Sequence, residues 1–139
     1  MISFENAFET VMSRVRVLDP EPVELHAAAG RVLAEDIRSD IDMPPFDKSA
    51  MDGYACRRED LPGPLRVVEV IQAGSAPTLA VGQGECAKIM TGAMVPEGAD
   101  CVIMVEHTEE TGDRTIRFTG NSTARNISRR AEDIRAGDI

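Results

Sequence analysis

The chain has 139 residues, 42% of them hydrophobic and 28% charged. This length and composition predict one ordinary domain or two small lobes that fold without disulfides or metals. The formal net charge is −9, from 24 acidic and 15 basic residues, which argues against nucleic acid or an anionic membrane as a partner, because both require a positive surface. With four phenylalanines, one tyrosine and no tryptophan, few aromatic rings are available to stack on bases.

The cysteines and the apolar runs predict a cytoplasmic protein. Cys56, Cys86 and Cys101 form no C-x-x-C pair and lie in apolar runs, as buried free thiols do. The first 20 residues lack a basic segment followed by an apolar one, and the longest strongly apolar run is 101–105. We therefore expect neither a signal peptide nor a membrane span, and a reducing compartment.

Residues 3–18 are predicted to form one amphipathic helix. Apolar residues recur at steps of three and four, which places them in a single stripe: Phe4, Ala7, Phe8, Val11, Met12, Val15 and Leu18. Ser3 is a suitable N-cap, and Pro20 is expected to end the helix. The stripe is expected to pack either in the core or against a second copy of the chain.

The remaining sequence is typical of short strands. They are predicted at segments rich in Val, Ile and Met and bounded by Gly, Pro or Asp: 23–26, 31–37, 54–57, 65–72, 86–90, 101–107 and 115–118. The alanine run at 27–30 could instead form a helical turn. Residues 39–47 are predicted to be a loop, and a turn at 111–113 is expected to join the last two strands as a hairpin.

One helix followed by many strands indicates an α+β fold and not a doubly wound sheet, which would alternate strands with helices. Pro44-Pro45 is expected to be an outgoing hinge, with 121–130 as the return. Residues 46–120 would then form a β lobe inserted into a first lobe made of residues 1–45 and 121–139.

The first candidate site is the loop 46–54, where Lys48, Ser49 and Asp52 bring a cation, a hydroxyl and a carboxylate together. Asp52 could hold Mg²⁺, which takes one or two carboxylates with waters and substrate phosphates. Lys48 could meet an oxyanion as a point charge. The alternative is an ordinary loop before a strand, since Asp52-Gly53 is a common turn dipeptide.

Two further polar segments are candidates. Thr91 and Gly92 follow a predicted strand, so backbone amides and a hydroxyl could face a ligand there, or the segment could be a plain connection. Arg129 and Arg130 could present a bidentate fork to phosphate or another oxyanion, or could form a solvated, salt-bridged surface. Asp42, in contrast, is expected only to face water.

Three runs, in this order, resemble the N-terminal region of the molybdopterin molybdenumtransferase (MoeA/gephyrin) family: PPFDKSAMDGYACR, IMTGAMVPEGADCVIMVEHT and NISRRAEDIRAGD. The resemblance covers essentially the whole chain. The aspartate of the family's DGY motif falls on Asp52 and the threonine of its MTGA motif on Thr91, which implies that both are catalytic. It also implies substrate contacts at the neighbouring positions of these motifs: Lys48, Ser49, Gly53, Gly92, Arg129 and Arg130.

The resemblance implies part of an enzyme that inserts molybdenum from molybdate into adenylylated molybdopterin and releases AMP, with Mg²⁺ at Asp52. It further implies a homodimer, a molybdopterin adenylyltransferase as a partner, and an α/β catalytic domain from a longer chain or in trans. Without that domain the 139 residues are expected to be inactive. The alternative is a non-catalytic dimerisation or scaffold module of the same architecture. Ala131 replaces the family's usual glycine and is expected to adopt an ordinary φ.

Overall fold

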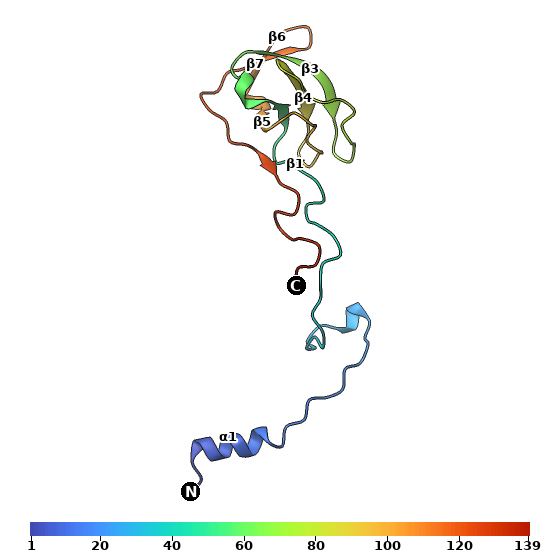
Figure 1. Ribbon diagram of the computed structural model, residues 1–139, viewed down its shortest axis with the longest axis vertical. Helices are drawn as coiled ribbons and strands as arrows, with labels where there is room; N and C mark the ends of the chain where they lie inside the picture. Colours follow the sequence, from blue (N-terminus) through green and yellow to red (C-terminus); the bar gives the residue numbers. More distant parts are fainter. The chain divides into compact units, whose positions relative to one another are not determined.

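A computed structural model describes all 139 residues, and its contacts divide the chain into two units, Met1–Ile37 and Arg38–Ile139 (Figure 1). The chain holds one α-helix near its N-terminus and eight short strands after it. This confirms the predicted α+β class. No helix is long and apolar enough to cross a membrane.

The first unit contains helix α1, Phe4–Met12, which is shorter than predicted. Ser3 caps it as expected, because its side chain accepts a hydrogen bond from the Asn6 N–H. The predicted end at residue 18 is wrong, since the helix stops at Ser13. None of its residues is buried, and a helix gains most of its stability from packing its apolar face. An amphipathic pattern without a surface to cover it therefore supports only a short helix.

The strands predicted at 23–26 and 31–37 are also wrong. Leu25–Ala27 forms a 3₁₀ turn, η1, and residues 31–37 form no regular element. A strand requires a hydrogen-bonded neighbour, and no segment of this unit offers one. The helical alternative considered for the alanine run is closer to the structure.

The second unit is built on one curled sheet of six strands in the order β5-β2-β4-β3-β7-β6. The strands are β2 Gly53–Cys56, β3 Pro64–Ile71, β4 Glu85–Ile89, β5 Cys101–Met104, β6 Thr108–Gly112 and β7 Thr115–Phe118. Five of them match predicted strands within one residue at each start. The predicted strand 101–107 ends early, because Val105–His107 forms a 3₁₀ turn, η3, ahead of β6. Another 3₁₀ turn, η2 Arg58–Asp60, follows β2.

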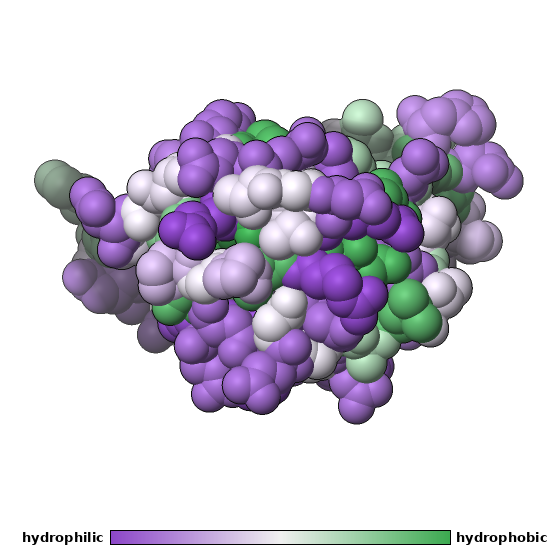
Figure 2. All heavy atoms as spheres, turned by 90° about the horizontal axis from the view of Figure 1, so that it is seen from above, coloured by the Kyte–Doolittle hydropathy of each residue, from purple (hydrophilic) through white to green (hydrophobic).

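Alternating side chains of the sheet build two separate cores. On β2, Tyr54 and Cys56 enter one cluster with Leu65, whereas Ala55 enters the other with Ile89, as the period of two along a strand requires. All four residues of β2 are buried, so the strand that follows Asp52 is held on both faces. Outside these cores, hydrophilic side chains cover much of the face seen from above (Figure 2).

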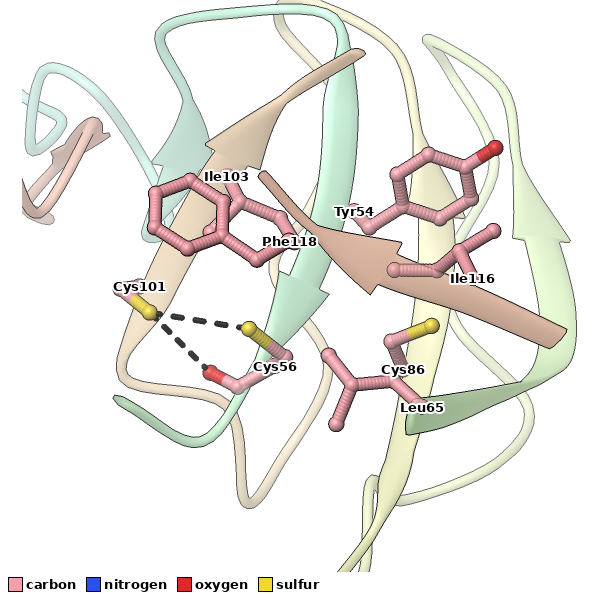
Figure 3. Packing of buried hydrophobic residues seen from close by; sticks show 8 residues of the cluster. All are labelled: Tyr54, Cys56, Leu65, Cys86, Cys101, Ile103, Ile116 and Phe118. Atoms are coloured by element: carbon pink, nitrogen blue, oxygen red, sulfur yellow. Dashed lines mark hydrogen bonds between the residues drawn. The ribbon is translucent and has the colours of Figure 1, made fainter. Parts of the chain in front are cut away.

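The three cysteines are buried and free, as predicted. Cys56 and Cys101 lie opposite each other on β2 and β5, with their Sγ atoms 3.7 Å apart (Figure 3). Burial raises the pKa of Cys86 to about 12, so this thiol remains protonated at neutral pH. Because all three are buried in one core cluster, the cysteines serve as small apolar core residues.

Two segments far apart in sequence run together below the sheet. Strand β1, Lys48–Ser49, pairs antiparallel with β8, Ile127–Ser128. Further out, the Met43 N–H donates to the Ile134 carbonyl at 2.7 Å and the Ser39 N–H to the Asp138 carbonyl at 2.9 Å. Residues 38–47 otherwise form no strand, in keeping with the predicted loop. The division into residues 1–45 with 121–139 and an inserted lobe 46–120 stays a prediction.

Ala131 adopts a φ of 59°, in the left-handed region, so the expectation of an ordinary φ is wrong. Neighbouring contacts impose this conformation. The Ala131 N–H donates to the Pro44 carbonyl at 2.9 Å, and the Glu132 N–H donates to the Arg129 carbonyl at 3.1 Å. These bonds close a turn against the outgoing segment, and together they override the backbone preference of alanine.

Replacing Ala131 with glycine is expected to stabilise the protein by about 0.5–1 kcal/mol. A left-handed conformation costs a residue with a Cβ roughly 1–2 kcal/mol, and the extra chain entropy of glycine offsets about half of this gain. Urea unfolding of Ala131→Gly measures the change. Ala136→Gly, which lies in the same segment without a positive φ, is the control and should lose stability. Equal losses in both variants would show that Ala131 is not strained.

Candidate functional site

Sheet pairing brings Asp52 and Thr91 together. Asp52 immediately precedes β2 and Thr91 follows β4, and the antiparallel register pairs Gly53 with Ile89. The backbone N–H and the hydroxyl of Thr91 both donate to Asp52 Oδ1, at 2.6 and 2.7 Å. Both residues are exposed. The two residues that the family resemblance singled out thus form one small polar site beyond the start of β2 and the end of β4.

These hydrogen bonds favour the charged form of Asp52. The Thr91 N–H, and then the Thr91 hydroxyl, hold the pKa of the Asp52 carboxyl below its usual value, against a smaller opposing effect of desolvation. Donors that bind a carboxylate stabilise its ionised form. At neutral pH the site therefore presents a fixed negative charge whose second oxygen, Oδ2, accepts no hydrogen bond from the protein.

One carboxylate with a free oxygen suits Mg²⁺, which takes few protein carboxylates and completes its shell with water and substrate phosphate. A dedicated protein cage for a metal is absent, because no three His, Cys, Asp or Glu side chains are grouped to hold an ion. The residues present therefore fit a Mg²⁺ ion that is shared with a substrate.

The loop that carries Asp52 is fastened to the loop that carries Thr91 through Ser49. The Ser49 N–H donates to the Ala93 carbonyl at 2.9 Å, and the Gly92 N–H donates to the Ser49 carbonyl at 2.8 Å. Ser49 is 1% exposed, and its hydroxyl donates to the Met51 carbonyl at 2.6 Å. The backbones of both loops are thereby held side by side beneath the Asp52–Thr91 pair.

Glycines are required at two positions of this site. A Cβ on Gly53 would lie 1.9 Å from the Ile103 carbonyl oxygen, so β2 and β5 approach more closely than any side chain allows. Gly92 has a φ of 83°, which a residue with a Cβ rarely adopts. Both glycines therefore have a structural reason to be present, independent of any ligand.

Lys48 is half-buried and lies in no ion pair. Its backbone pairs with Ser128 and bridges to Met94. It is therefore a cation next to the Asp52 loop that remains available for an oxyanion.

Arg129 and Arg130, by contrast, are occupied within the chain. The Arg129 guanidinium is bonded to the Asp47 carboxylate. The Arg130 Nε donates to Asp42 Oδ2 at 2.7 Å, and the Arg130 N–H donates to Asp47 Oδ1 at 2.8 Å. The salt-bridged alternative for these arginines thus describes the structure. Their guanidinium groups pair with Asp47 and Asp42, whereas Glu132 accepts only the Arg129 backbone N–H, at 2.8 Å.

The expectation that Asp42 only faces water is wrong. Its carboxylate accepts hydrogen bonds from Arg130 and from the Ala136 N–H at 2.9 Å, and these, the Ala136 bond first, lower the pKa of Asp42. Asp47 is the other residue that sequence reasoning missed, since it joins both arginines to the Asp52 loop. The partners lie more than 80 positions apart, so no local pattern signals these pairs.

The comparisons with known proteins are consistent with one another. The sequence profile of the family described as "MoeA N-terminal region (domain I and II)" matches residues 2–139. A molybdopterin molybdenumtransferase of Nostoc sp. is 40% identical over 126 residues, which are 86% of this chain and 29% of that protein. One of Staphylococcus aureus strain Mu50 is 37% identical over 148 residues, or 99% of this chain and 35% of that protein.

The fold gives the same result. The crystal structure of the molybdopterin biosynthesis moeA protein from Pyrococcus horikoshii OT3 matches with a TM-score of 0.86 at 35% identity. The match covers 100% of this chain and 39% of that one. The chain therefore spans about a third of the length of the relatives it matches.

Proposed function

This chain belongs to the family of the MoeA N-terminal region (domain I and II), and on that premise we propose that it supplies one wall of the active site of a molybdopterin molybdenumtransferase. The reaction would insert molybdenum from molybdate into adenylylated molybdopterin and release AMP. One observation carries the proposal: Thr91 binds Asp52 through both its N–H and its hydroxyl. The family's two functional motifs are thereby joined into one exposed anionic site.

The roles follow from the contacts of each residue. Thr91 fixes the Asp52 carboxylate and keeps it ionised, and Oδ2 would hold Mg²⁺. Bound there, Mg²⁺ would supply charge neutralisation at the substrate phosphate or oxyanion. Lys48 would attract the same anions as a point charge, and Gly92 would let the backbone approach the substrate closely. Gly53 would act only indirectly, since it is buried against β5. Arg129 and Arg130 would reach substrate only by leaving Asp47 and Asp42.

The rest of the catalytic site would come from an α/β domain, in a longer chain or in trans. The length of the relatives, of which this chain covers about a third, supports this part of the proposal. A cytoplasmic molybdopterin adenylyltransferase would deliver the adenylylated substrate. Positioning two reactants supplies several kcal/mol of barrier reduction, roughly 7–11 in good cases, and one exposed wall of a site cannot position both.

We therefore expect the 139 residues alone to show no molybdenum insertion. The assay uses molybdate, Mg²⁺ and adenylylated molybdopterin, and measures AMP release and the molybdenum bound to the pterin. Activity should appear when the chain is joined to the remaining two thirds of the Nostoc relative. Turnover by the chain alone would contradict the composite site, and an inactive chimera that folds and binds substrate would contradict the proposed role of this chain.

We also propose that the chain forms a homodimer through its first unit. The apolar stripe of α1 is uncovered, with Phe4 78% and Phe8 56% exposed, and their rings stack 6.3 Å apart. Covering such a surface removes apolar area from water at about 25 cal/mol per Å². Light scattering at micromolar concentration should give twice the chain mass.

The double variant Phe4→Ser/Phe8→Ser should be monomeric and keep the melting temperature of the second unit, while Glu9→Gln on the same helix should stay dimeric. A monomeric mass for the unmodified chain at every concentration would contradict the proposed homodimer. The exposed stripe also supports the second candidate function, a scaffold module without catalysis. If the chain is a scaffold module, it should form dimers, and its chimera with the rest of the Nostoc relative should be inactive.

A further inference from the structure

We infer that Ser49 is a positioning residue whose hydroxyl sets the geometry of the Asp52–Thr91 pair and does not touch substrate. Ser49 is the one polar or charged residue buried in the second unit, at 1% exposure. A ligand approaching Asp52 from solvent therefore cannot reach its hydroxyl. The inference rests on the proposed function for its consequence in catalysis, but its test requires no turnover.

The hydroxyl is fully engaged within its own turn. It donates to the Met51 carbonyl at 2.6 Å and accepts from the Met51 N–H at 3.3 Å. A serine bonded in this way fixes the backbone over the next two residues. The residue that follows this turn is Asp52, so the turn determines the direction from which the carboxylate reaches Thr91.

The backbone of Ser49 fixes the other half of the pair. Its carbonyl accepts the Gly92 N–H at 2.8 Å, and its N–H donates to Ala93, so the residue after Thr91 is anchored to Ser49 as well. Ser49 also pairs with Ile127 in the short β1–β8 ladder. One buried residue therefore positions both partners of the Asp52–Thr91 contact. The Ser49 side chain holds the turn before Asp52, and the Ser49 backbone holds the segment after Thr91.

Replacing Ser49 with alanine removes only the turn and keeps the backbone bonds. Met51 is 39% exposed, so the turn lies at the surface, and without the hydroxyl the loop gains freedom at Asp52. We expect the Asp52–Thr91 hydrogen bonds to loosen. The Thr91 N–H donates one of these bonds, at 2.6 Å, so the Thr91 amide signal should shift and its proton should exchange faster with water in Ser49→Ala.

The chain offers a matched control. Ser39 forms the same turn two residues ahead of Ile41, with its hydroxyl donating to the Ile41 carbonyl at 2.7 Å and accepting the Ile41 N–H at 3.4 Å. It lies in the outgoing segment and makes no contact with Asp52. Ser39→Ala therefore removes an equivalent turn without the proposed consequence.

The experiment follows the Thr91 amide by ¹H–¹⁵N NMR in the 139-residue chain and records its chemical shift and its hydrogen-exchange rate. The expected result is a shifted and faster-exchanging Thr91 amide in Ser49→Ala, with both properties unchanged in Ser39→Ala. Ser49→Cys, which replaces the hydroxyl with a weakly hydrogen-bonding thiol, should resemble Ser49→Ala and supplies the measurement if the alanine variant unfolds.

Two results would overturn the inference. One is a Thr91 amide in Ser49→Ala and Ser49→Cys whose chemical shift and exchange rate equal those of the unmodified chain. The other is an equal change in Ser39→Ala, which would make the effect a general loss of rigidity. Neither result depends on molybdenum insertion, so an inactive chimera would leave this inference standing, and an unchanged Thr91 amide would leave the proposed function standing. In the active chimera, Ser49→Ala should lower kcat by about tenfold with little change in KM, as expected for a misplaced catalytic group.

Discussion

Asp52→Asn is expected to lower the rate of molybdenum insertion by about a hundredfold or more, in a chain completed by the remaining domains. Removing one preorganised electrostatic group from an active site typically costs this much. Asparagine retains the Oδ1 acceptor for both bonds from Thr91, so the shape of the site is kept while its charge is lost. Single-turnover kinetics with saturating substrates measures the effect on the chemical step.

Thr91 provides the comparison. Thr91→Val removes the hydroxyl donor and keeps the backbone N–H donor, so one of the two bonds to Asp52 Oδ1 remains. A neutral hydrogen bond contributes roughly 0.5–1.5 kcal/mol, and we expect a loss of about tenfold or less. Melting curves should be nearly unchanged for both variants. An insertion rate in Asp52→Asn equal to that of the unmodified protein would mean that the loop is an ordinary turn before a strand. A large fall in the melting temperature of this variant would mean that Asp52 has a structural role.

The pH dependence should have a definite sign. The bonds from Thr91 depress the pKa of Asp52, so its charge is present at neutral pH and is lost only as the pH falls through the lowered value. In Thr91→Val the acid limb of the kcat profile should therefore move to higher pH. An acid limb at the same position in both proteins would show that Asp52 does not control it.

The sheet was largely predictable from sequence because its strands carry their own signals. Residues 115–118 alternate inward and outward side chains between turn residues, and the predicted bounds equal those of β7. The helix length was not predictable in the same way. The apolar stripe continues to Leu18, but periodicity reports which face would be buried and not whether a partner covers it.

The sequence indicated which residues belong to the candidate site, but not how they contact one another. The motifs pointed to Asp52 and Thr91, but their contact follows from the β2–β4 register, which no local pattern determines. The role of Ser49 depends on its burial, and the pairing of Arg129 with Asp47 joins residues 82 positions apart. Ala131 shows the same limit, since its positive φ accompanies a long-range bond from its N–H to the Pro44 carbonyl, and its residue type disfavours that conformation.

The close approach of β2 and β5 yields the largest expected effect on stability. Gly53 follows Asp52 directly and pairs with Met104 on β5. A Cβ at this position would lie 1.9 Å from the Ile103 carbonyl oxygen, 2.9 Å from its carbonyl carbon and 3.1 Å from the Met104 Cα. All three atoms belong to the backbone, so no side-chain rotation can relieve the overlap.

Gly53→Ala is therefore expected to destabilise the second unit by about 3 kcal/mol or more, at the upper end of the cost of overpacking. For a domain of roughly 100 residues, this corresponds to a fall in melting temperature of about 10 °C or more. Gly112→Ala is the matched control, because Gly112 lies in β6 with no atom within 4 Å of the added Cβ, and it should change stability by no more than about 0.5 kcal/mol. Urea unfolding of both variants measures the difference. Equal urea midpoints for the two variants would mean that β2 and β5 can move apart at no cost in stability. Asp52 precedes β2 directly, so it too would then be free to move.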